Sequence, residues 1–189
     1  MKMKTILFLI VATASLSSYA QKSKDLVYPN LPVDEKTKLI TYEGVGKLDG
    51  VSAKELYGRA LEWIKTYHKN PTEKIRKQDE ENGEIEVFAR FPIFAYDKKG
   101  VKTTSNAGLI QYTMVLQFKD GRYKYVVSSL NYKAPSYQPI DSWLLDKEND
   151  PNADNHAYQL ADIDLELKAM IKDMKSKIAA KADAKGDDW

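Results

Sequence analysis

The chain has 189 residues, of which 29 are basic and 27 acidic, and it contains no cysteine. The lack of cysteine excludes disulfides, thiolate metal sites and iron–sulfur clusters. The nearly even charge balance argues against a nucleic-acid partner and against a polybasic membrane contact, because both rely on an excess of basic residues.

The first twenty residues have the pattern of a cleavable export signal. Lys2 and Lys4 form a short positive head, an apolar run covers residues 6–14, and Ser-Tyr-Ala at 18–20 fits the small-residue pattern before a signal peptidase cut. We therefore expect cleavage after Ala20 and a periplasmic or extracellular location. The apolar run is shorter than the roughly 20 apolar residues that a spanning helix needs. Without a cysteine after the cut there is no site for a lipid anchor.

The rest of the chain divides by composition. We expect an extended leader over residues 21–36, a single domain over 37–178 and a flexible tail over 179–189. After the cut the basic and acidic residues balance at 27 each, because both excess positive charges belong to the signal.

The domain is expected to begin with a strand over residues 39–48 that contains Gly44 and Gly46. Glycine inside a strand marks a bulge or a close approach of another group to the backbone. A helix follows, with Ser52 as its N-cap and Glu55 three residues later, which is the pattern of a capping box. Apolar residues then recur at helical spacing: Leu56, Ala60, Trp63, Ile64 and Tyr67.

Beyond the helix the hydrophobic period changes from 3.6 to 2 residues, which predicts four strands. Residues 72–79 are rich in charge and suit an edge strand, and residues 84–94 and 109–119 alternate clearly. The polar residues 101–108 are assigned to no element.

Asp120-Gly121 predicts a two-residue hairpin turn. This turn sets the register so that the apolar side chains of both strands share one face, at the cost of placing Lys119 opposite Arg122. The other expected pairs are Phe118 with Tyr123, Leu116 with Tyr125, and Met114 with Val127.

A long connection over residues 132–155 leads to a final helix. One stripe of that helix is apolar: Leu160, Ile163, Leu167, Met170, Ile171, Met174 and Ile178. The order strand–helix–four strands–helix predicts an α+β fold. Its antiparallel sheet carries two helices on one face and leaves the other face toward water.

Two surfaces are candidates for binding. The first is the open face of the sheet, represented by Gln111, Thr113, Gln117, Lys124 and Ser128. The second is a set of aromatic residues in proline-containing segments, which are typical of contact surfaces: Phe94, Tyr96, Tyr137 and Trp143. The alternative for the aromatic segments is that Phe91, Ile93 and Trp143 cover the open end of the core.

Metal-binding and catalytic patterns are weak. His68 and His156 are not spaced as a ligand pair, so we interpret both as structural or surface residues. Residues 150–154 have the D-x-N-x-D spacing of a calcium loop, but Asn155 and Ala161 stand where glycine and glutamate are needed. We interpret this segment as a solvated loop in which Asp154 or Asn155 caps the final helix. No nucleophile, metalloprotease or phosphate-loop motif is present, so we expect no enzyme, no cofactor and no metal.

Three motifs resemble a known family: Leu31-Pro-Val-Asp-Glu35, Ser52-x-x-Glu-Leu-Tyr57 and Phe118-Lys-Asp-Gly-Arg-Tyr-Lys-Tyr125. Together with the element order, they resemble the exported bacterial domains of unknown function, common in Bacteroidetes, that have a TATA-binding-protein-like (TBP-like) fold. The resemblance covers roughly residues 31–130 and rests on a lead-in, a helix cap and a turn. It therefore implies a fold and no activity, and the fold name implies no binding of DNA.

We predict an exported, non-enzymatic binding domain whose partner is an unknown protein or small molecule, with no nucleic acid and no membrane anchor. The alternative is a helix-grip carrier that holds a small apolar ligand between the sheet and the last helix. Its cavity would be lined by Met114, Tyr125, Met170 and Met174. A third possibility, a hydrolase of extracellular polymers, would require a cleft with clustered carboxylates.

Overall fold

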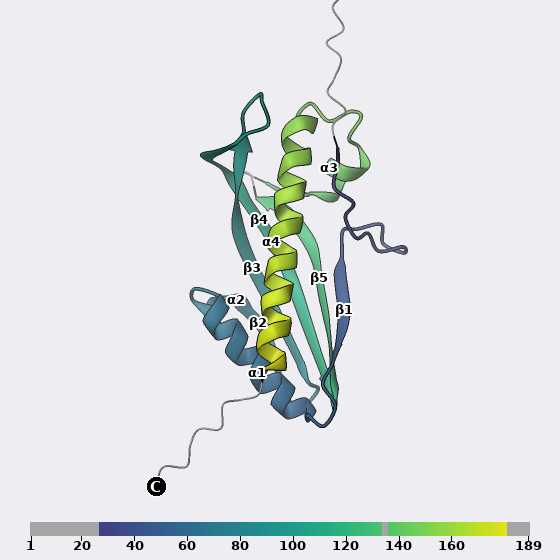
Figure 1. Cartoon of the computed structure of the whole chain (residues 1–189), viewed down its shortest axis with the longest axis vertical. Helices are drawn as coiled ribbons and strands as arrows, with labels where there is room; N and C mark the ends of the chain where they lie inside the picture. The colour runs from purple at the N-terminus through teal and green to yellow at the C-terminus, as the bar shows by residue number, and fades with distance from the viewer. Residues whose placement is uncertain (1–26, 134–135, 181–189) are drawn as a thin grey trace, which may run out of the picture.

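The computed structural model describes residues 27–133 and 136–180 (Figure 1). The predicted signal peptide with its cut after Ala20, and the tail from Lys181 onward, lie outside the described residues. None of the described helices is long and apolar enough to cross a membrane.

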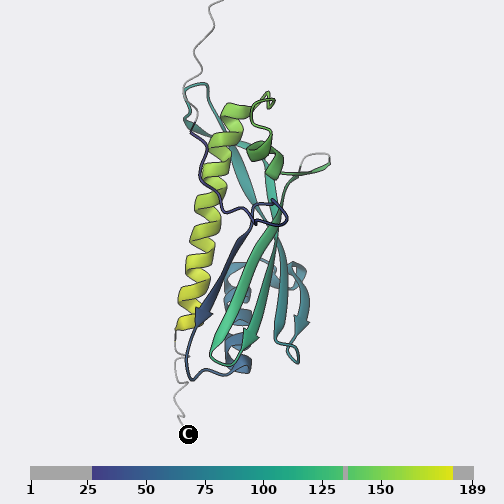
Figure 2. The same ribbon diagram turned by 90° about the vertical axis from the view of Figure 1, so that its right-hand side faces the viewer.

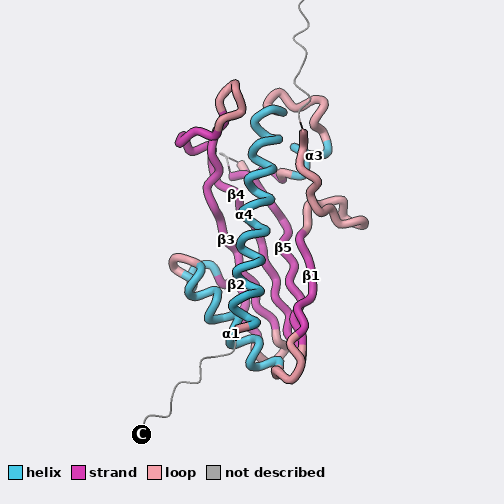
Figure 3. Tube along the Cα trace, in the orientation of Figure 1, coloured by secondary structure: helices cyan, strands magenta, loops and turns pink. Residues whose placement is uncertain are grey.

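Six strands form one antiparallel sheet in the order β1-β5-β4-β3-β2, with β6 added to β5. The strands are β1 (Tyr42–Lys47), β2 (Ile75–Asp79), β3 (Glu84–Tyr96), β4 (Lys102–Lys119), β5 (Arg122–Lys133) and β6 (Tyr137–Pro139). The long helices α1 (Ala53–Tyr67) and α4 (Ala153–Ala179) lie on the same side of this sheet (Figures 1, 2 and 3). Two short helices, α2 (Pro71–Lys74) and α3 (Asp141–Leu145), complete the fold. The predicted α+β class and its one-sided helical layer are confirmed.

Helix α1 begins as its sequence predicts. The Ser52 hydroxyl accepts a hydrogen bond from the Glu55 N–H at 3.2 Å. The Glu55 carboxylate pairs with Arg59 at 2.6 Å instead of returning to the N-cap, so only half of the capping box forms. Of the predicted apolar stripe, Tyr67 remains exposed, whereas the other members are buried: Leu56, Ala60, Trp63 and Ile64.

The β4–β5 hairpin has the predicted register. Phe118 pairs with Tyr123, Leu116 with Tyr125, Met114 with Val127, and Lys119 lies opposite Arg122. Further along the hairpin the register shifts between Gln111 and Thr113, near Ser129, whose φ is 55°. This bulge places one extra residue in β5 and brings Asn131 opposite Gln111.

Strand β1 lies beside β5, where its two glycines face the core. A Cβ atom on Gly44 would lie 2.6 Å from the Tyr125 hydroxyl, and one on Gly46 would overlap the Tyr123 ring. The close approach predicted from these glycines is therefore confirmed. The Tyr42 hydroxyl donates to Asp164 at 2.9 Å and ties β1 to α4.

The core lies between the sheet and the two long helices. The whole predicted stripe of α4 is buried, and it packs on the inward-facing side chains of the strands. Leu31 of the expected leader is also buried, so this part of the leader belongs to the core. The buried Asp141 carboxylate of α3 accepts the Ile40 N–H at 2.6 Å, which fixes the segment before β1.

Three predicted details differ from the structure. The unassigned residues 101–108 form the first part of β4, where bulges interrupt the pairing with β3. The expected edge strand over residues 72–79 begins one turn late, because Pro71 favours the first position of a helix and α2 precedes β2. The predicted cap of the final helix is wrong, since α4 begins after Asn152 with no side-chain cap, and the Asn155 carboxamide accepts the Tyr96 N–H at 3.1 Å.

Candidate functional site

The side of the sheet opposite α1 and α4 is covered by none of the described helices, and we call it the open face. Its charged side chains are mostly basic, although the whole chain has nearly equal numbers of basic and acidic residues. The basic residues of the open face are Lys47, Arg76, Lys77, Arg90, Lys119, Arg122, Lys124 and Lys133. The acidic ones are Glu43, Asp79, Glu84 and Glu86. The open face therefore has twice as many cations as anions.

Three cations form a row across the sheet at the Asp120-Gly121 turn. Lys47 of β1 lies opposite Arg122 of β5, which lies opposite Lys119 of β4. Within the described residues none of these three, which we call the basic row, takes part in an ion pair. Like charges directly opposite each other on neighbouring strands are destabilising. The row therefore costs folding free energy.

A shallow hollow of about 240 Å³ adjoins the basic row. Val45 contributes an exposed apolar side chain to it, and two cations of the row stand at its rim. Its lining residues are Val45, Gln117, Lys119, Arg122, Tyr123 and Lys124. The hollow thus combines apolar surface with positive charge.

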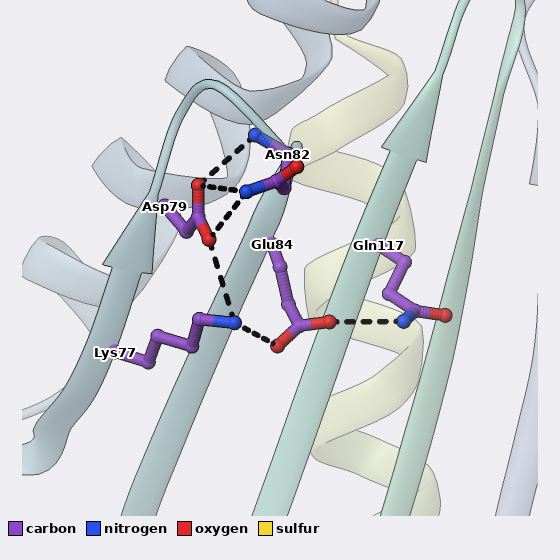
Figure 4. Close-up of polar contacts among 5 residues, drawn as sticks. All are labelled: Lys77, Asp79, Asn82, Glu84 and Gln117. Carbon is purple, nitrogen blue, oxygen red and sulfur yellow. Dashed lines mark hydrogen bonds and ion pairs between the residues drawn. The ribbon is translucent and has the colours of Figure 1, made fainter.

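Two of the four acidic residues of the open face, Asp79 and Glu84, are held in a network at the edge of the sheet opposite β1 (Figure 4). Glu43 on β1 instead pairs with Lys124 at 2.9 Å. Lys77 contacts Asp79 at 3.4 Å and Glu84 at 2.9 Å. The second oxygen of Glu84 accepts the Gln117 side-chain amide at 3.0 Å, and Asp79 accepts two bonds from the Asn82 side chain. The bonds from Lys77 and Gln117 hold the pKa of Glu84 below its usual value. Both carboxylates are therefore neutralised locally, while the basic row is not.

The five residues predicted for the binding face all lie on the open face. Gln117 is the cross-strand neighbour of Lys124, and Thr113 is that of Ser128. Gln111 is only 6% exposed, since it lies under the Arg90 guanidinium, whose Nε donates to it at 3.2 Å. Gln111 is thus too buried to contact a partner directly, and the role of the other four stays a prediction.

The four aromatic candidates do not form one surface. Tyr137 is 50% exposed and accepts a bond from Arg90 at 3.2 Å. Tyr96 stacks on Tyr158 with ring centroids 4.9 Å apart, and Phe94 lies beneath the Lys102 ammonium. Trp143 is 6% exposed and stacks on His156 at 3.9 Å. Its ring closes the end of the core and is not presented to a partner.

In the loop with calcium-like spacing, residues 150–154, the Asp150 carboxylate bonds to other groups of the protein. Asp150 bonds to the Asn152 N–H at 2.8 Å and to His156 Nδ1 at 2.5 Å. Among the described residues, no three His, Asp or Glu side chains cluster in a way that could hold a metal ion.

The residues named for an apolar carrier lie in the packed interior. Met114, Met170 and Met174 are buried, and the Tyr112 hydroxyl donates to the Met170 sulfur at 3.1 Å. Tyr125 is buried above Gly44. These side chains belong to the hydrophobic core, and the carrier alternative stays a prediction.

Sequence reasoning identified part of this site. The turn signal predicted that Lys119 lies opposite Arg122, but nothing local indicates that β1 pairs with β5. The sequence therefore did not predict Lys47 as a site residue, and it did not predict the complete basic row.

Two solved structures share the architecture. A TBP-like protein from Parabacteroides distasonis is 12% identical, with a TM-score of 0.55, and the match covers 77% of this chain and 97% of that one. A DUF4468 family protein from Bacteroides ovatus is 15% identical, with a TM-score of 0.59, and the match covers 79% and 91% respectively. The chain is thus a TBP-like α+β domain.

Residues 42–133 match the family model described as a domain of unknown function (DUF4468) with TBP-like fold. This part of the chain is similar to the DUF4468 family, and the predicted resemblance is confirmed. None of the curated proteins matches the chain.

Proposed function

We propose that this chain is an exported, non-enzymatic binding domain that recognises an acidic protein surface through the open face of its sheet. The observation that carries the proposal is the basic row of Lys47, Arg122 and Lys119. An arrangement that costs stability is retained where function requires it. A partner carboxylate would offset the repulsion within the row.

The composition of the open face favours a protein over other polyanions. Val45, Phe88, Val115 and Val126 place apolar surface between the charges, as in the centre of a protein interface. At the edge around Glu84, Lys77 is already paired with two carboxylates, so it has little charge to offer a continuous phosphate backbone that crossed the whole face.

A binding role without catalysis agrees with the state of the carboxylates on this face. Hydrogen bonds lower the pKa values of both Asp79 and Glu84 and keep them ionised. A general acid needs the opposite shift.

Site-specific photo-cross-linking in the secreting cell tests the proposal. A photoreactive residue at Val45 reports on the open face, and one at Leu165 of α4, a comparably exposed apolar position, serves as the matched control. We expect a protein adduct from position 45 and not from position 165, with an acidic segment at the cross-linked site of the partner. Adducts of equal yield at both positions, or no adduct at position 45, would contradict the proposal.

A further inference from the structure

A cleft of about 540 Å³ lies at the edge of the sheet where β2 begins. It is bounded by the C-terminal end of α1, by α2, by β3 and by α4, and Figure 1 shows α1 and α2 beside β3. Its volume is in the range of small-molecule sites, which span roughly 300–1,000 Å³. The open-face hollow is less than half as large.

The floor and the rim of this cleft differ in chemistry. Apolar and aromatic side chains form the floor: Phe91, Tyr112, Leu167 and Met170. Two cations, Lys69 and Lys74, and one carboxylate, Glu166, are among the lining residues. Arg90 also lines the cleft, but its guanidinium bonds to Gln111 and Tyr137 on the open face. The cleft therefore combines an apolar floor with a rim that carries more positive than negative charge.

His68 gives the cleft an unused hydrogen-bonding group. Its ring contacts Trp63 and Tyr67 edge-on, with centroids 5.9 and 5.1 Å away. The Nε2 atom is buried, and no described group hydrogen-bonds to it. Burial, with a smaller contribution from Lys74, lowers the pKa of His68 to about 4, so the ring is neutral at neutral pH. A buried polar atom without a partner costs free energy, and a bound ligand would supply the missing partner.

We propose that this cleft binds a small organic carboxylate with an apolar or aromatic body. The body lies on Phe91, Tyr112 and Met170. The carboxylate faces Lys69 and Lys74 at the rim, and His68 Nε2 hydrogen-bonds to the ligand. This site is separate from the basic row and does not depend on the proposed protein partner.

Three probes separate the parts of this proposal in ¹⁵N-resolved NMR titrations of residues 21–189. They are 3-phenylpropionate, its neutral analogue 3-phenylpropan-1-ol, and acetate, which lacks the apolar body. We expect 3-phenylpropionate to shift the amide signals of residues 67–70 and 166–170 and to bind at least fivefold more tightly than either of the other probes. Equal binding of the neutral alcohol, or no shift with 3-phenylpropionate at 10 mM, would overturn the proposal.

Matched variants then locate the site. Lys69→Ala combined with Lys74→Ala removes two rim charges, whereas Lys54→Ala combined with Lys65→Ala removes two charges of α1 that do not line the cleft. We expect the first pair to weaken 3-phenylpropionate at least fivefold and the control pair to leave its Kd within twofold. His68→Phe, which keeps a ring and removes both nitrogens, should also weaken it severalfold. Equal losses in the rim and control pairs would contradict the assignment.

Discussion

The packing of Tyr123 on Gly46 predicts opposite effects of the same substitution at two glycines. A methyl group at Gly46 overlaps the buried Tyr123 ring, so the ring or β1 must move. Overpacking of this kind lowers the free energy of unfolding by about 1–3 kcal/mol. Replacing glycine also lowers the entropy of the unfolded chain, which raises the free energy of unfolding by about 0.4–1 kcal/mol. Gly58 lies in α1 with nothing within 4 Å of a Cβ atom, so alanine there should stabilise the helix by about 1 kcal/mol.

Thermal unfolding followed by circular dichroism at pH 7 measures both effects. One kcal/mol corresponds to about 2–4 °C in Tm for a domain of this size. The midpoints of these ranges leave a net loss of about 1.3 kcal/mol, so Gly46→Ala should lower Tm by about 3–5 °C, and Gly58→Ala should raise it by about 2–4 °C. In a Tyr123→Ala background, the loss caused by Gly46→Ala should disappear, because the ring that it overlaps is gone. An unchanged or higher Tm for Gly46→Ala, or the same loss in both backgrounds, would refute this reasoning.

Two further predictions concern buried polar groups. Because the pKa of His68 is about 4 in the folded state, against 6.5 as its ordinary value, the unfolded chain takes up this proton first as the pH falls. The free energy of unfolding should therefore fall between pH 6.5 and 4 by about 2–3 kcal/mol more than in His68→Phe. Urea unfolding at several pH values measures this, and identical slopes for the two proteins would contradict it. Asp141→Ala leaves the Ile40 N–H without its acceptor and should cost about 1–3 kcal/mol in urea unfolding at pH 7, whereas Asp141→Asn, which keeps an acceptor, should cost less. Equal losses in the free energy of unfolding for Asp141→Ala and Asp141→Asn would contradict a stabilising role of the hydrogen bond from Ile40 to Asp141.

Local patterns predicted the elements that local chemistry determines. The Ser52 cap, the Asp120-Gly121 turn and the apolar stripe of α4 each depend on residues within a few positions of one another. Periodicity fixed the inward face of each long strand because a one-residue slip would expose its apolar row.

Long-range pairing could not be predicted in the same way. The position of β1 beside β5 depends on Tyr123 and Tyr125 covering Gly44 and Gly46, and these contacts join residues far apart in the sequence. The place of Lys47 in the basic row and the His68 cleft both arise from such contacts, so neither has a signature in the sequence. Gln111 was expected at the surface from strand alternation, but alternation does not show that Arg90 covers it.

The most direct test of the central claim is the Kd between this domain and its cross-linked partner after reversal of one charge in the basic row. Lys119→Glu places a carboxylate opposite Arg122, so it removes a repulsion and should not weaken the fold. Lys172→Glu makes the same charge change on an exposed position of α4 and is the matched control. We predict that Lys119→Glu raises the Kd at least tenfold and that Lys172→Glu leaves it within twofold. An unchanged Kd for Lys119→Glu, or an equal rise in both variants, would contradict recognition through the open face.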